Sequence, residues 1–392
     1  MKSLGLLAAF GAAAAAVAVA AACSDDEGLV RDRGDGSAST TVLDGSSSCG
    51  ITIPTTYDSP TFETNAAQEL LLRQEFEDLL APMVTVESQL AADAGATPVT
   101  QAQLNALWSK GTPSVMATTS AYYQAKVAPS LSAYGIAVAD GAYVADVPDG
   151  GDKGGALGGY IFDANGVDLH QTIEKGSYAA AFYNQAVSLI VLGPITTGTI
   201  DRLVASFGAS PAFSNNDNAA QNRDVLSAAY AARRDSKDVA NPGPYQRIRL
   251  ALIKAKASVE AGAKCDADRD AALVVFLNQW EIATYASVVF DFNDIIARVS
   301  ASDIPGALHS YGEAVGFLSS FKTIAPSRRI ISDAQIDDLL QQIYAADGAP
   351  IAAYKLKTTP FDAVSRVQAG IGVIKGIYAF TDAQIESFKQ NY

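Results

Sequence analysis

The stretch DAALVVFLNQWEIATYASVVFDFNDIIARV, residues 270–299, decides the fold class of this chain. Its first half is apolar on nearly every side of a helical wheel, and a helix that is apolar all round is buried. We therefore expect a central helix here, with Phe276 and Trp280 in the core of the protein.

The segments around this stretch show the pattern of amphipathic helices. In residues 63–90 apolar side chains recur at helical spacing after Thr64 or Asn65, either of which can cap the helix. Comparable patterns cover residues 101–110, 113–135, 169–192, 197–208, 219–236, 244–261, 303–323, 332–346 and 361–390. Strand-like alternation is confined to about residues 141–168, where we expect a small hairpin or irregular insertion.

These patterns predict an all-α protein in which two helical-bundle lobes pack together and carry the small insertion. The break Asn241-Pro242-Gly243-Pro244 marks the boundary between the lobes. We assign residues 57–240 to an N-terminal helical lobe and residues 241–392 to a C-terminal one.

The N-terminus predicts export. Lys2 precedes an apolar segment, residues 4–22, that ends at Ala20-Ala21-Ala22-Cys23 and resembles a bacterial lipoprotein signal. We expect residues 1–22 to be removed and Cys23 to be lipidated, which anchors the chain to a membrane on the periplasmic or surface side of the cell envelope. An ordinary secretory signal is the alternative. Residues 23–56, rich in Gly, Ser, Thr and Asp, predict a disordered tether.

Composition excludes several classes of function. A formal net charge of −14 disfavours nucleic acid as a partner. Three Cys and two His leave no room for a Cys-rich zinc framework or a three-His site. The sequence contains no His-Glu-x-x-His, Gly-x-Ser-x-Gly, Walker-type or Cys-x-x-Cys motif. This favours binding over catalysis.

Several stretches carry a family resemblance. They are residues 62–70, Glu174-Lys175-Gly176 with residues 182–186, Lys254-Ala255-Lys256, Trp280-Glu281, residues 309–317 and residues 332–336. Together they resemble an uncharacterised family of exported bacterial lipoproteins that carries only a domain-of-unknown-function label. Its architecture is similar to that of imelysin-like proteins, which implies a role in iron or other metal acquisition.

The chain departs from the imelysin-like signature Gly-x-His-x-x-Glu. Gly306-Ala307-Leu308-His309 is followed by an acidic residue at Glu313, one position later than the signature places it. A site that depends on that acid would be altered.

The two histidines of the chain share one pattern. His170 is followed four residues later by Glu174, and His309 by Glu313, so each pair lies on one face of a helix. If the two helices face each other, they present a ligand set suited to Fe or Zn in a bundle core. The alternative is two separate pairs, solvated or locally hydrogen-bonded. Glu281 and Lys254 are candidates for a second shell or for a structural ion pair.

Two further features concern cysteines and oxygen-rich loops. Cys49 and Cys265 could form a disulfide in an oxidising compartment, and free thiols are the alternative. Residues 146–152 and 163–168 are dense in oxygen ligands and are candidates for Ca²⁺, although neither has the EF-hand spacing and solvated loops are the simpler interpretation.

The leading hypothesis is a membrane-anchored helical lipoprotein that binds a metal ion or small ligand between its lobes. A metal-dependent hydrolase or peptidase built on His309 and Glu313 is a second hypothesis. A structural lipoprotein that docks an envelope protein partner is a third, which an exposed apolar groove would favour.

Overall fold

A computed structural model describes residues 47–92, 95, 97–145, 154–214, 224–235 and 242–391. These residues belong to one compact unit. The signal segment, Cys23 and residues 24–46 lie outside the described residues, as does the predicted lobe boundary near residue 240.

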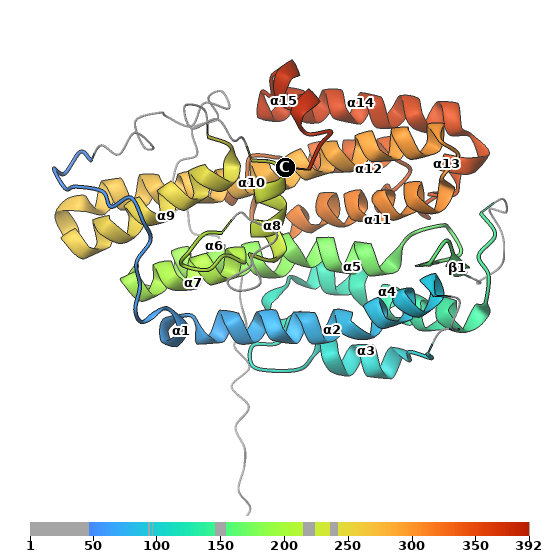
Figure 1. The fold of residues 1–392 in the computed structure, drawn as a ribbon, viewed down its shortest axis with the longest axis horizontal. Helices are drawn as coiled ribbons and strands as arrows, with labels where there is room; N and C mark the ends of the chain where they lie inside the picture. The colour runs from blue at the N-terminus through green and yellow to red at the C-terminus, as the bar shows by residue number, and fades with distance from the viewer. Residues whose placement is uncertain are drawn as a thin grey trace, which may run out of the picture. The chain divides into compact units, whose positions relative to one another are not determined.

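The fold is all-α, as predicted (Figure 1). The α-helices are α1 (Phe62–Asn65), α2 (Ala67–Ala91), α3 (Gln101–Trp108), α4 (Ala121–Asp140), α5 (Leu169–Ser177), α6 (Asn184–Leu192), α7 (Thr197–Phe207), α8 (Leu226–Arg233), α9 (Pro244–Ala261), α10 (Asp266–Ser300), α11 (Ile304–Ser320), α12 (Asp333–Gln342), α13 (Lys355–Thr358), α14 (Pro360–Tyr378) and α15 (Asp382–Ser387). Single 3₁₀ turns lie at Met116–Thr118, Ala263–Cys265, Phe321–Thr323 and Pro326–Arg328. Strands β1 (Gly155–Leu157) and β2 (Tyr160–Phe162) complete the list.

The central helix is α10, which confirms the prediction for residues 270–299. It packs against α9, α11, α14 and α8, and Phe276 and Trp280 are buried in the core. Helix α11 in turn packs on α5, and α5 on α4. Figure 1 shows these helices stacked from α14 through α10, α11 and α5 down to α2 and α3.

One long helical stretch, Ala263–Ser300, is the only part of the described chain with the length and apolar composition to cross a membrane. Because 78% of its apolar window is buried inside the protein, it has the character of a core helix.

Several helix predictions differ from the structure in detail. The predicted helix over residues 113–135 begins only at Ala121, where the Ser120 side chain accepts a hydrogen bond from the amide of Tyr123 and caps α4. The helix over 361–390 is divided into α14 and α15 by Ala379, which has a left-handed φ of 51°. The helix over 169–192 contains a π-helical segment, Tyr178–Tyr183, between α5 and α6.

The predicted insertion is a two-stranded antiparallel hairpin. Gly155 pairs with Phe162, and Leu157 with Tyr160. The connecting residues Gly158 and Gly159 have φ of 61° and 91°, a conformation that glycine adopts without steric cost. The hairpin leads into α5.

The disulfide between Cys49 and Cys265 is present, which confirms that prediction. The Ser47 hydroxyl also donates a hydrogen bond of 2.8 Å to Asp268, and Arg249 donates one of 2.6 Å to the carbonyl of Thr55. Residues 47–56 are thus held against α9 and α10, which differs from the disordered tether expected for this part of the chain.

Candidate functional site

Helices α5 and α11 pack unusually closely and run in the same direction. Gly312 lies against Asp168 and Gln171, and one turn later Gly316 lies against Gly176. A Cβ atom at Gly312 would stand 2.8 Å from the Cβ of Asp168, and one at Gly316 would stand 3.0 Å from the Gly176 amide nitrogen. Only glycine allows this approach, which makes the two helices that carry the His/Glu pairs direct neighbours.

A buried lysine joins the two helices. Lys175 Nζ lies 2.7 Å from Glu174 Oε2 and 3.2 Å from Glu313 Oε1. The ammonium also faces two aromatic rings, with 5.7 Å to the centroid of Tyr178 and 5.0 Å to that of Tyr230. We call these five residues the Lys175 cluster.

Tyrosine hydroxyls complete the hydrogen bonding of the two carboxylates. Tyr178 Oη donates to Glu174 Oε1 over 2.7 Å, and Tyr230 Oη donates to Glu313 Oε1 over 3.1 Å. Each glutamate therefore has both a cation and a hydroxyl group as partners, and the lysine is the cation that they share.

The electrostatics of the cluster keep Glu174 and Lys175 charged. Burial alone would raise the pKa of Glu174, but the positive charges of Lys175 and His170 hold it at about 2. Burial alone would likewise lower the pKa of Lys175, but the charge of Glu174, the two tyrosines and Glu313 raise it well above its usual range. Glu174 and Lys175 therefore form an ion pair at physiological pH.

Each histidine uses Nδ1 to contact a carboxylate. His170 Nδ1 lies 3.0 Å from Glu87 Oε2 of α2, and His309 Nδ1 lies 3.0 Å from Asp168 Oδ2 at the start of α5. Burial alone would lower the pKa of both rings, but these carboxylates outweigh it and raise both values. His309 also stacks on Tyr160 of β2, with 4.3 Å between ring centroids.

The second ring nitrogen of His170 is different. His170 is 4% exposed, and its Nε2 has no hydrogen-bond partner among the described residues. Glu174 Oε2, one helical turn away, is 4.0 Å from this nitrogen. An unpaired buried polar atom costs about 1–3 kcal/mol, so this nitrogen is a position at which a ligand would be stabilising.

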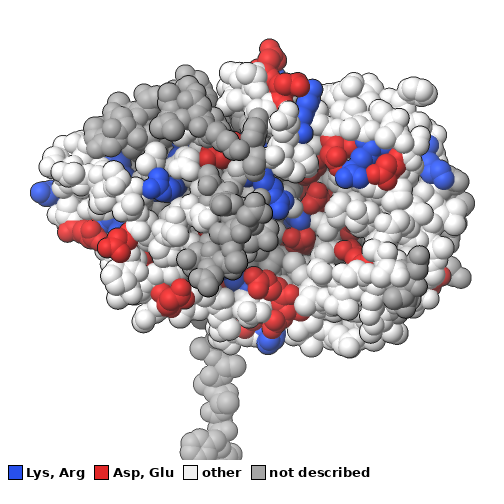
Figure 2. All heavy atoms as spheres, in the orientation of Figure 1, with Lys and Arg blue, Asp and Glu red and all other residues white. Residues whose placement is uncertain are grey.

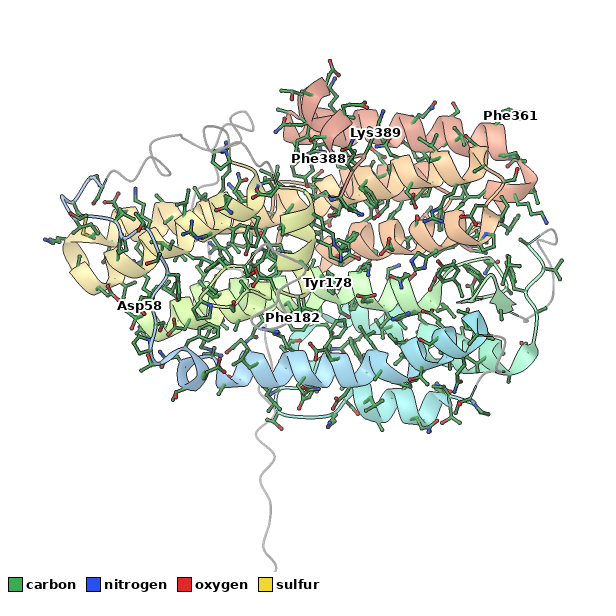
Figure 3. The ribbon with its side chains drawn as sticks, in the orientation of Figure 1. Asp58, Tyr178, Phe182, Phe361, Phe388 and Lys389 are labelled. Atoms are coloured by element: carbon green, nitrogen blue, oxygen red, sulfur yellow. A yellow bond between two sulfur atoms is a disulfide. The ribbon has the colours of Figure 1, made fainter. Side chains whose placement is uncertain are left out.

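Local folding explains why these side chains lie together. The Asp168 carboxylate accepts a hydrogen bond from the Gln171 amide and caps α5, which fixes where the helix begins. The π-helical segment Tyr178–Tyr183 follows at once, and Tyr178 and Phe182 point into the middle of the molecule (Figure 3). Single π-helical turns occur frequently at functional sites.

The structure places the four predicted metal ligands in separate sets of contacts. The two helices face each other, but Glu174 and Glu313 are bridged by Lys175, while His170 and His309 contact Glu87 and Asp168. In the part of the chain that the structure describes, no three His, Cys, Asp or Glu side chains surround one point that could hold an ion.

The two second-shell candidates have other partners. Glu281 accepts hydrogen bonds from the amides of Ile330 and Ile331 and from Tyr378 Oη. Lys254 lies 3.7 Å from Asp268, near the disulfide. The structure thus gives Glu281 and Lys254 structural contacts in separate parts of the interior.

The candidate Ca²⁺ loop that the structure describes, residues 163–168, also has protein partners for its oxygen atoms. Residues 146–152 lie outside the described residues. In the second loop, the Asp163 carboxylate accepts hydrogen bonds from the amides of Asn165 and Val167, and Asp168 caps α5 and contacts His309. The oxygen atoms of this loop therefore hold backbone amides and an imidazole.

Sequence reasoning missed three contributors to the site. Glu87 comes from α2 and Tyr230 from α8, and no local spacing links either residue to α5. Lys175 directly follows Glu174, and this adjacency is the one signal that could have indicated an internal counter-ion. The run Tyr-Ala-Ala-Ala-Phe-Tyr of the π-helical segment has the same composition as an ordinary helix.

The surface of the protein has two further features. Figure 2 shows small groups of acidic and basic side chains distributed over one face, with uncharged surface between them. An open, mostly apolar groove of about 480 Å³ lies between α2 and α3, lined by Pro82, Thr85, Thr97, Pro98, Val99, Gln103, Ala106 and Leu107. The groove does not include the Lys175 cluster.

Comparison with known proteins returned no relative. No family model, no curated protein and no solved structure matches the chain. The resemblance to exported lipoproteins of imelysin-like architecture therefore stays a prediction.

Proposed function

We propose that this protein is an exported, membrane-anchored binding protein that takes up a divalent metal cation, Fe or Zn, at His170 and Glu174. The observation that carries the proposal is the buried, unpartnered Nε2 of His170, which lies 4.0 Å from Glu174 Oε2. An imidazole nitrogen and a carboxylate are ligands that both metals accept.

The surroundings of His170 support this assignment. A metal-binding histidine usually donates its other ring N–H to a carboxylate, which fixes the tautomer and the orientation of the ring. Glu87 stands 3.0 Å from Nδ1 of His170 and supplies this contact. The Glu174 side chain keeps 18% of its surface exposed, so water can complete the coordination sphere and the cation can exchange.

Lys175 acts in this proposal as an internal substitute for the cation. Its ammonium group lies 2.7 Å from Glu174 Oε2 and must move away from that oxygen when a metal ion binds. Glu313, 3.2 Å away, is the second carboxylate that keeps the displaced lysine paired. The exchange avoids leaving a buried charge alone, which would cost several kcal/mol.

A loosely held, exchangeable cation suits uptake or transfer better than a permanent structural role. The same open coordination would be needed for the alternative of a metal-dependent hydrolase. Because the sequence has none of the familiar hydrolase motifs, binding is the function that we propose.

The metal content of the purified protein tests the proposal. The full chain is purified from membranes without a histidine tag, equilibrated with Fe²⁺ or Zn²⁺, and measured by elemental mass spectrometry. We expect close to one metal ion per chain, and a loss of at least tenfold in occupancy in His170→Gln and in Glu174→Gln.

The matched control is His309→Gln, which removes the other histidine of the chain and keeps the His170 site. Its occupancy should stay near that of the unaltered protein. A protein that takes up no metal, or one whose metal survives in His170→Gln, would overturn the proposal.

The groove between α2 and α3 favours a second candidate function, in which the groove receives an apolar segment of an envelope protein partner. Ala106→Arg would fill the groove with a charged side chain, whereas Ala261→Arg places the same charge at the end of α9. Crosslinking in intact cells should no longer capture a partner with Ala106→Arg. It should still capture the partner with Ala261→Arg.

A further inference from the structure

Helix α8 connects the Lys175 cluster to the C-terminal residues 388–391. Helix α8 supplies Tyr230, which forms one wall of the Lys175 cluster. Its hydroxyl donates to Glu313, and its ring lies 5.5 Å from that of Phe317 and 5.7 Å from that of Tyr178. Tyr230 is thus the residue through which α8 closes the cluster.

The end of α8 is held by the C-terminal segment. Arg234 follows the helix directly and is 3% exposed. Its Nη1 donates to the carbonyl oxygens of Phe388 at 3.0 Å and Gln390 at 2.8 Å, and its Nη2 donates to the side chain of Asn391. One guanidinium group therefore binds three of the last residues of the chain.

Aromatic packing fixes the segment on its other side. Phe388 is 4% exposed and packs edge-to-face on Phe380, with 5.0 Å between ring centroids. Phe380 stacks on Tyr378, and Tyr378 on Tyr285 of α10. Figure 3 shows Phe388 and Lys389 between α14 and the central helix.

The guanidinium also lies in a buried, charged setting. It stands 4.1 Å above the ring of Phe290. The neighbouring Asp291 is 1% exposed, and neither of its carboxylate oxygens has a hydrogen-bond partner among the described residues. A buried arginine usually pairs directly with a carboxylate. Arg234 instead donates hydrogen bonds to carbonyl groups of the C-terminal segment.

We propose that residues 388–391 form a clasp that holds Arg234, and with it α8 and Tyr230, over the Lys175 cluster, so that release of the clasp opens the cluster to solvent. Opening a helix that covers a binding site is a common way to control exchange of a ligand. The part of this inference that concerns cation exchange rests on the proposed function, whereas the mechanical part does not.

Hydrogen exchange tests the mechanical part. The full chain in detergent micelles is compared with Arg234→Lys, which keeps the charge but loses the planar fork, and with Phe388→Ala, which weakens the clasp from the other side. We expect the amides of residues 226–234 to exchange at least tenfold faster in both variants, while those of α2 and α3 stay unchanged.

The control is Lys389→Ala, because the Lys389 side chain pairs with Glu386 and projects from the same segment. It should leave the exchange of α8 unchanged. An unchanged rate of amide exchange in α8 in both clasp variants would overturn the proposed clasp. An equal rise in the exchange rates of α2 and α3 would also overturn it.

Release of bound Zn²⁺ to an external chelator tests the consequence for exchange. We expect release at least fivefold faster in Arg234→Lys and in Phe388→Ala than in Lys389→Ala. If α8 loosens in a protein that takes up no cation, the clasp stands and the proposed function fails. If α8 loosens and bound Zn²⁺ leaves at an unchanged rate, the control of the cluster by the clasp is wrong.

Discussion

Two carboxylates buried in the same protein have opposite surroundings. Glu281 of α10 is fully buried and accepts hydrogen bonds from two backbone amides, Ile330 at 2.7 Å and Ile331 at 2.8 Å, and from Tyr378. Glu174 of α5 is bound by side chains alone, Lys175 and Tyr178, and lies 4.0 Å from an unpartnered imidazole nitrogen.

In the proposed function, this difference separates a structural carboxylate, Glu281, from a metal-binding one, Glu174. The amides of Ile330 and Ile331 cannot leave Glu281 unless the loop after α11 unfolds, so these two backbone partners are fixed. The partners of Glu174 are the side-chain groups of Lys175 and Tyr178, and exchanging a side-chain partner breaks no backbone hydrogen bond. Both carboxylates are buried, so the feature that distinguishes Glu174 as the candidate ligand is the type of its partners.

The largest effect is expected from Lys175→Met. Removing the ammonium leaves two buried carboxylates without their shared counter-ion, which should lower the free energy of unfolding by about 3–5 kcal/mol. Urea unfolding followed by circular dichroism measures this change. In the control Lys126→Met, which breaks an exposed pair with Asp347, the loss should stay below about 1 kcal/mol. Equal losses in the two variants would contradict the account of the cluster.

Glu281→Gln should cost somewhat less, about 2–4 kcal/mol, because the amide group places a donor against backbone donors. The comparison predicts that this variant still binds Zn²⁺ with unchanged affinity once folded, whereas Glu174→Gln loses binding. Isothermal titration calorimetry of both variants checks this. A fall in affinity in Glu281→Gln would remove the distinction between the two carboxylates.

Gly316→Ala tests the close approach of α5 and α11. The added methyl group would stand 3.0 Å from the Gly176 amide nitrogen and from the Thr172 carbonyl oxygen, and we expect a loss of about 1–3 kcal/mol in urea unfolding. Gly372→Ala is the control, since its added methyl group meets nothing within 4 Å. That control should be neutral or stabilising by up to about 1 kcal/mol. A tolerated Gly316→Ala would show that the helices can separate freely.

The smallest effect is a pH dependence of stability in the metal-free protein. The pKa of His170 is raised in the folded state by Glu87. Its contribution is therefore fully present below the unfolded value of about 6.5 and is lost as the pH rises through the folded value. Urea midpoints between pH 6 and pH 9 should fall less steeply in His170→Gln than in the unaltered protein. Parallel curves would contradict this assignment.

Cation binding should have the opposite pH dependence. A metal requires the neutral imidazole, so the affinity for Zn²⁺ should rise with pH until His170 is deprotonated. The two opposite slopes come from one side chain, which distinguishes His170 from a histidine that only stabilises the fold.

The sequence predicts the fold better than the site, for a physical reason. The uninterrupted apolar run of α10 and the periodicity of the other helices are local signals, and they led to the all-α class, the central helix and the hairpin. A count of thiols left the disulfide between Cys49 and Cys265 as one of two alternatives, and the structure shows which one is present. Each of these features depends on residue type and spacing alone.

The site depends on contacts between distant segments. The four-residue spacing from His170 to Glu174 and from His309 to Glu313 identified the two helices that meet. It could not show that Lys175 takes the place between the carboxylates, or that Glu87 reaches His170 from α2. Those contacts follow from the close packing of α5 and α11 and from the placement of α2, which no local pattern encodes.

The most direct test of the central claim is nitrogen-15 nuclear magnetic resonance of the protein labelled at histidine. The chain contains only two histidines, so four ring nitrogens report on both imidazoles, and His170→Gln assigns them. The account predicts that added Zn²⁺ shifts the Nε2 resonance of His170 into the range of a metal-bound nitrogen and leaves His309 unchanged. Unchanged resonances of His170 at saturating Zn²⁺, or a shift confined to His309, would contradict it.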